Sequence, residues 1–147
     1  MRINFLKGRL GKHRFHSMLI HFPSALYPFS FVMDGLGFLL NNNSFNSAGL
    51  YSLIGAIGAS ILAIVYGTID FLSIESGTNI WRKAGIHALL NSTWFIVFSI
   101  LLLYRMKNPE EPIGWIYLTI MGSALIGLFY SNYLGADLIV KHRIGIE

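Results

Sequence analysis

Four long apolar stretches constrain this chain more than any other feature of its sequence. They cover about residues 17–40, 48–72, 84–104 and 113–140. A helix needs about 20 residues to cross the roughly 30 Å hydrocarbon core of a bilayer, and each stretch reaches that length. The sequence therefore predicts an all-α fold over residues 1–147: a single-domain, polytopic integral membrane protein built as a four-helix bundle.

The composition excludes several other classes of protein. Charged residues make up 12% of the chain and hydrophobic residues 54%, whereas soluble domains carry about 25% charged residues. A chain this apolar is neither a soluble domain nor disordered. The absence of cysteine excludes disulfides, thiolate zinc sites, iron–sulfur clusters and covalently attached haem. No hydrolase, kinase or nucleotide-binding motif is present, so we do not expect a stand-alone enzyme.

The basic residues predict the orientation of the helices. All Lys and Arg residues except Arg105 and Lys107 lie in the N-terminal tail, the second loop and the C-terminal tail. These three segments share one side of a four-helix bundle, and short cytoplasmic segments are enriched in Lys and Arg. We therefore expect both termini in the cytoplasm and the chain in the inner membrane. The net charge of +4 then indicates contact with lipid headgroups and no nucleic-acid binding, because no soluble domain displays the basic residues.

Ionisable residues inside the apolar stretches are few, and most fall at one depth. Because the helices alternate in direction, five of them are expected in the inner leaflet: His21, Asp70, His87, Asp137 and His142. Polar groups at such depth are costly and usually serve a function. Asp34 is expected alone in the outer half, with no basic partner, either protonated or reaching for the interface.

Helical spacing places several of these residues on faces that can point inward. The second stretch has a face of small residues, which shares its sector with Asp70: Gly55, Ala59, Ala63 and Gly67. The third stretch has a polar and aromatic face: His87, Asn91, Trp94 and Phe98. The fourth stretch has a second small-residue face: Gly127, Ser131 and Gly135. His16 lies about 140° from His21 and is expected to face headgroups. No sequence repeat relates the two halves of the chain.

Two inward-facing histidines on neighbouring helices suggest a cofactor. A b-type haem needs one histidine from each of two helices, with small residues beside the rings. His21 and His87 are the candidate axial ligands, and Asp70 and Asn91 are the expected neighbouring groups. Arg14, Arg82 and Lys83 are candidates to pair with the haem propionates. On this hypothesis the protein transfers electrons together with other membrane redox proteins.

Other interpretations of the same residues remain open. His21, His87 and His142, with Asp70, are a candidate zinc or copper site, and without a metal they can form a proton relay. Either arrangement fits a small metal or proton transporter. In a non-redox structural or accessory protein, a hydrogen bond between His87 and Asp70 only stabilises the bundle. The small-residue faces are compatible with a homo-oligomer as well as with a monomer.

Four ordered motifs then carry a resemblance to a known family. They are His16-Ser-Met-Leu-Ile-His21-Phe-Pro23-Ser-Ala-Leu26, Gly67-Thr-Ile-Asp70-Phe71, His87-Ala-Leu-Leu-Asn91 and Leu134-Gly-Ala-Asp-Leu-Ile-Val-Lys-His142. From about His16 to Ile146 the chain resembles a bacterial membrane family catalogued as domain of unknown function 2231. The resemblance implies a four-helix inner-membrane protein, with polar positions matching His21, Asp70, His87, Asn91 and His142, but no established activity.

Three positions depart from the pattern of that family: Phe71, Ala136 and Arg143. The family usually has tryptophan after the aspartate, a second glycine after Gly135 and a glycine after the last histidine. The departures around His142 weaken its case as a ligand more than they weaken the cases of His21 and His87.

Overall fold

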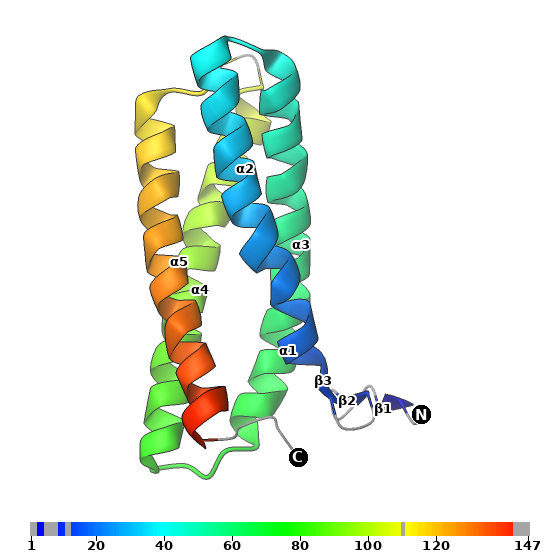
Figure 1. The fold of residues 1–147 in the computed structure, drawn as a ribbon, viewed down its shortest axis with the longest axis vertical. Coiled ribbons are helices and arrows are strands. Elements are labelled where there is room, and N and C mark those ends of the chain that lie inside the picture. The colour runs from blue at the N-terminus through cyan, green and yellow to red at the C-terminus, as the bar shows by residue number, and fades with distance from the viewer. Residues whose placement is uncertain (1–2, 5–8, 11–12, 110, 143–147) are drawn as a thin grey trace.

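The computed structural model describes residues 3–4, 9–10, 13–109 and 111–142 of the chain. Four long helices form an elongated bundle (Figure 1): α2 His21–Leu40, α3 Asn43–Leu72, α4 Asn79–Lys107 and α5 Trp115–His142. The end of α5 and the loop between α3 and α4 lie at one end of the bundle, and the turn between α2 and α3 lies at the other; α2 begins in the same half as the end of α5 (Figure 1). The all-α fold is confirmed.

The segment before α2 differs from the predicted single helix over residues 17–40. A short helix, α1 Phe15–Leu19, precedes α2 and is separated from it at Ile20. Before α1 lie three two-residue strands: β1 Ile3–Asn4, β2 Arg9–Leu10 and β3 His13–Arg14. They form an antiparallel sheet in the order β1-β2-β3. Strands this short carry no alternation of apolar and polar residues, so the sequence did not predict them.

Helix caps explain why α3 and α4 begin earlier than predicted. The Asn42 side chain accepts a hydrogen bond from the Ser44 amide (2.9 Å), and the Thr78 hydroxyl accepts one from the Trp81 amide (3.1 Å). Such bonds satisfy amides that have no partner within the helix. Asn41 ends α2 in the left-handed conformation, with φ of 49°, which asparagine tolerates better than most residues. The turn between α2 and α3 is therefore tighter than the polar turn expected from the sequence.

Three of the helices are long and apolar enough to cross a membrane: Asn43–Leu72, Asn79–Lys107 and Trp115–Lys141. The helix α2, which the sequence analysis also counted as a span, is not among them. Its inner face carries the buried polar residues Ser30 and Asp34, which lower its average hydropathy.

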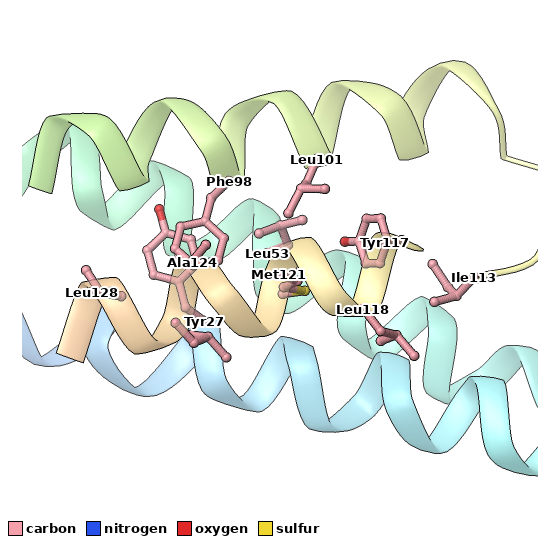
Figure 2. Packing of buried hydrophobic residues seen from close by; sticks show 12 residues of the cluster. Tyr27, Leu53, Phe98, Leu101, Ile113, Tyr117, Leu118, Met121, Ala124 and Leu128 are labelled. Atoms are coloured by element: carbon pink, nitrogen blue, oxygen red, sulfur yellow. The ribbon is translucent and has the colours of Figure 1, made fainter. Parts of the chain in front are cut away.

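Buried side chains fill the middle of the bundle (Figure 2). Tyr27 of α2 stacks on Phe98 of α4, with ring centroids 4.0 Å apart and an angle of 17° between the planes. The Tyr27 hydroxyl and the Ser60 hydroxyl of α3 lie within hydrogen-bond distance (3.0 Å). Leu53 and Met121 are fully buried beside this pair. The centre of the bundle is thus a close-packed core to which all four long helices contribute.

An ion pair connects α2 to α4 nearer the other end of the bundle. Arg105 Nη1 donates to both carboxylate oxygens of Asp34, at 2.8 and 3.0 Å, and its Nη2 donates to the Asn46 carbonyl at 2.6 Å. Asp34 is fully buried and the Arg105 side chain is 9% exposed. The expectation that Asp34 lacks a basic partner is wrong. The predicted third helix ended at residue 104, which placed Arg105 in a loop.

Two glycines make room for this ion pair between α2 and α3. A Cβ atom at Gly49 would overlap the Asp34 carboxylate, and a Cβ atom at Gly37 would overlap the Asn46 side-chain amide. Small residues let helix backbones approach closely. Here they also leave the volume that the buried carboxylate and its neighbour occupy.

We expect Gly49→Ala to destabilise the protein by about 1–3 kcal/mol, because the added methyl group must displace the Asp34 carboxylate from Arg105. Thermal unfolding followed by circular dichroism in mild detergent measures this effect. Gly58→Ala is the matched control, because nothing lies within 4 Å of a Cβ atom there and the residue lies in the same helix. It should leave stability unchanged or raise it by about 0.5–1 kcal/mol. Equal effects of the two substitutions would contradict the packing argument.

Candidate functional site

Two half-buried histidines lie in the half of the bundle where α2 begins and α5 ends. The first is His16 of α1, whose Nδ1 lies 2.8 Å from the Ala63 carbonyl of α3. Its ring also packs on Gly67, one helical turn further along α3, where a Cβ atom would lie 2.9 Å from the His16 Nδ1 and Cε1 atoms. The expectation that His16 faces lipid headgroups is wrong. Ile20 keeps helical dihedral angles (φ −61°, ψ −21°), so His16, seven residues before the buried Pro23, lies on the buried face of this helical segment.

The second histidine, His87 of α4, makes the same kind of contact with α5. Its Nδ1 lies 2.8 Å from the Ser131 carbonyl. Its ring packs on Gly135, one helical turn further along α5, where a Cβ atom would lie 2.6 Å from His87 Cε1. Each half of the bundle thus supplies one histidine held in the same way.

These hydrogen bonds fix the tautomer of both rings. A carbonyl oxygen only accepts, so a neutral imidazole must carry its proton on Nδ1, and Nε2 is left with a free lone pair. The Asn91 Nδ2 atom lies 3.2 Å from both nitrogens of His87. It is therefore not in line with the Nε2 lone pair, and it donates to the His87 carbonyl at 3.0 Å. Histidines that bind metals are commonly held by such a bond from their other nitrogen.

His21 does not face the interior as expected from the sequence. Its side chain is exposed at the start of α2. It lines an open hollow of about 270 Å³ together with Phe22, Ala25 and Leu26, all from the same helix. The pairing of His21 with His87 placed the wrong face of this segment inward, because its buried face passes through Pro23 and Tyr27 and includes His16 but not His21.

The predicted carboxylates lie at the same end of the bundle. Asp70 is half-buried near the end of α3. Asp137 of α5 pairs with Lys141 at 2.6 Å and with Lys83 of α4 at 3.9 Å. Lys83 thus has an acidic partner within the protein, and Arg82 is exposed.

A site with three or four metal ligands finds no support among the residues that the structure describes. Within them, no three His, Cys, Asp or Glu side chains are grouped closely enough to hold a metal ion. His142 ends α5, but its side chain and that of Arg14 lie outside the described side chains. The part played by His142 in the predicted metal site thus stays a prediction.

The faces predicted on the third and fourth apolar stretches pack against each other. Gly135 lies under the His87 ring, and a Cβ atom at Gly127 would overlap the Trp94 indole. Phe98 continues this face into the core. On α3, Ala63 is buried and Gly67 contacts His16 as an inward face requires, but Gly55 is exposed. The inward face of α3 is thus rotated from the predicted one.

A family model described as "Predicted membrane protein (DUF2231)" matches residues 12–147. The match confirms the resemblance drawn from the four sequence motifs. No curated protein and no solved structure matches the chain.

We expect the neutral rings of His16 and His87 to be protonated at Nδ1 and not at Nε2. Nitrogen-15 NMR of histidine-labelled protein distinguishes the two tautomers. The exposed His21 serves as an internal control and should show no such preference for the Nδ1 tautomer. Variants His16→Gln and His87→Gln assign the signals. Protonation at Nε2 in either of these two rings would contradict the hydrogen bonds to the Ala63 and Ser131 carbonyls.

Proposed function

We propose that the chain, which belongs to the DUF2231 family of predicted membrane proteins, holds an iron porphyrin between the imidazoles of His16 and His87. On this proposal it is a small b-type cytochrome of the inner membrane that takes part in electron transfer with other membrane redox proteins. His87 keeps the role inferred from the sequence, and His16 replaces His21 as its partner.

The observation that carries the proposal is the matched setting of the two histidines. Each donates its Nδ1 proton to a carbonyl of a neighbouring helix, at 2.8 Å in both cases. A ring fixed in this way directs a basic Nε2 atom to a metal, and iron accepts imidazole ligands. Gly67 and Gly135 support the same arrangement, because the absence of a Cβ atom lets each imidazole lie directly against the neighbouring helix that holds it.

The protein's own groups would bind and tune such a cofactor, and iron porphyrin supplies reversible one-electron transfer when bound. Hydrogen bonds from Nδ1 to a carbonyl raise the basicity of the ligating nitrogen and fix the plane of each ring. Asn91 restrains His87 further by donating to its carbonyl, and so does the Ser131 hydroxyl at 3.3 Å. These contacts support two pre-oriented ligands, one from each half of the bundle.

The orientation of the chain belongs to the same proposal. The excess of Lys and Arg in the segments before α2, between α3 and α4, and after α5 supports a cytoplasmic location for this end of the bundle. The histidine pair then lies toward the cytoplasmic leaflet, and Asp34 and Arg105 toward the opposite one. The ion pair between the buried Asp34 and Arg105 supports α2 as a fourth span, because pairing the charge of Asp34 lowers the main cost of inserting that helix into a membrane.

Single cysteines test this topology cleanly, because the native chain contains none. We expect Ser44→Cys, an exposed position in the first turn of α3, to react with a membrane-impermeant maleimide on intact spheroplasts. Ser76→Cys, in the loop before α4, should react only after the membrane is broken. The reverse pattern would place the histidine pair on the outer side.

The cofactor is tested by expressing the full chain with added haem and purifying it in mild detergent. We expect an absorption spectrum typical of low-spin iron with two histidine ligands. His16→Ala and His87→Ala should each abolish that spectrum, because either change removes one axial ligand. His21→Ala is the matched control and should leave it unchanged.

Two results would reject the proposal. One is a folded protein that contains no porphyrin after haem-replete expression. The other is a spectrum that survives His16→Ala but is lost with His21→Ala. Elemental analysis of the same samples detects zinc or copper in place of iron and so covers the metal-binding alternative.

A further inference from the structure

The two halves of the bundle repeat one pattern that the sequence alone conceals. The helix α3 buries Gly49, Leu53, Ala56, Ser60 and Ala63. Sixty-eight positions later in each case, α5 buries Tyr117, Met121, Ala124, Leu128 and Ser131. Gly67 and Gly135, the glycines under the two histidines, are separated by the same interval. Because only Ala56 and the glycine are identical to their counterparts, the repeat is invisible as a sequence similarity.

The first helix of each half repeats as well, with a constant interval of 71 positions. The counterparts in α4 of His16, Tyr27, Ser30 and Asp34 are His87, Phe98, Leu101 and Arg105. His16 and His87 make the same contacts, within the first and second halves respectively. The hairpin α1–α3 and the hairpin α4–α5 are thus two versions of one structural unit.

Two contacts between the halves join counterpart residues, as contacts beside a twofold axis do. In a symmetric pair, a residue next to the axis meets its own counterpart. Tyr27 stacks on its counterpart Phe98, and Asp34 bonds to its counterpart Arg105. The aromatic pair is alike on both sides, whereas the charged pair is opposite. At the ion pair, the contacting faces of the two hairpins are therefore complementary in charge and not identical.

We propose that the Asp34–Arg105 pair selects the partner of each hairpin, so that the face of the first hairpin accepts the second hairpin and rejects a second copy of itself. Two first hairpins paired around the same axis would bring two buried aspartates together, and two second hairpins would bring two arginines together. Like charges in such a position are strongly unfavourable away from water. The pair thus directs a duplicated chain to close on itself and prevents association between the like halves of two chains.

The experiment starts from the folded full chain, with a protease site inserted between Glu75 and Ser76 in the exposed loop before α4. After cleavage in mild detergent, the native halves should purify together through a tag on the first half. Arg105→Asp should reduce the recovery of the second half at least about tenfold. Adding Asp34→Arg to that variant should restore it, because the opposite charges then face each other in reversed order.

The decisive measurement concerns pairing between two first hairpins. Cleaved Arg105→Asp protein is mixed with cleaved, differently tagged Asp34→Arg/Arg105→Asp protein, and the first halves are captured. We expect the first hairpin that carries Asp34→Arg to capture the one that retains Asp34, since they now differ in charge at the same position on the axis. Two differently tagged samples of cleaved Arg105→Asp protein should show no such capture.

A control variant and the double charge reversal each have an outcome that would reject the proposal. Lys83→Asp with Asp137→Lys reverses an ion pair that lies wholly within the second hairpin, and it should leave the association of the halves unchanged. If Arg105→Asp alone does not fold, the uncleaved double reversal must still fold with native helix content. Failure of the double reversal to fold, or capture only between unlike hairpins in the mixing experiment, would overturn the proposal.

Discussion

The bond between Asp34 and Arg105 is the interaction on which the arrangement of the bundle depends. A carboxylate that is fully buried in a helix core is tolerated only when its charge is paired and hydrogen-bonded. Arg105 meets that need with one nitrogen on both carboxylate oxygens and the other on the Asn46 carbonyl. These bonds connect α2, α3 and the end of α4. The bond therefore joins the two hairpins at one end, and a hydrogen bond from Asn132 Nδ2 to the Ser24 hydroxyl (3.2 Å) joins them toward the histidine end.

Close packing of glycines against polar side chains is a second recurring feature of the bundle. Gly49 makes room for the Asp34 carboxylate, and Gly67 and Gly135 make room for His16 and His87. In each case the absence of a Cβ atom lets a polar side chain lie directly on a neighbouring helix, where it reaches a partner. A stripe of small residues in this protein therefore serves polar groups as well as helix association.

How far the sequence predicted the site depended on where the helices begin and end. The face with His87 and Asn91 was predicted correctly, because it lies in the middle of a long helix with regular spacing. His21 was expected to face inward and His16 outward, whereas the structure has the reverse, because the buried face of this helical segment passes through Pro23 and Tyr27. Arg105 was missed because α4 continues to Lys107. Asp34 and Arg105 each lie near the end of a helix, on the same side of the bundle. This shared depth was a signal in the sequence that could have paired them.

The sequence by itself determined the class of the protein and the number of its long helices, because the length and apolarity of a segment are local properties of the chain. It also determined its family, through motifs that keep their order along the chain. Only the tertiary structure decided which histidines contact a neighbouring helix, which cation neutralises Asp34, and that the two halves share one plan. These depend on contacts between residues about 70 positions apart in the chain, and helical periodicity carries no information across the turns that separate them.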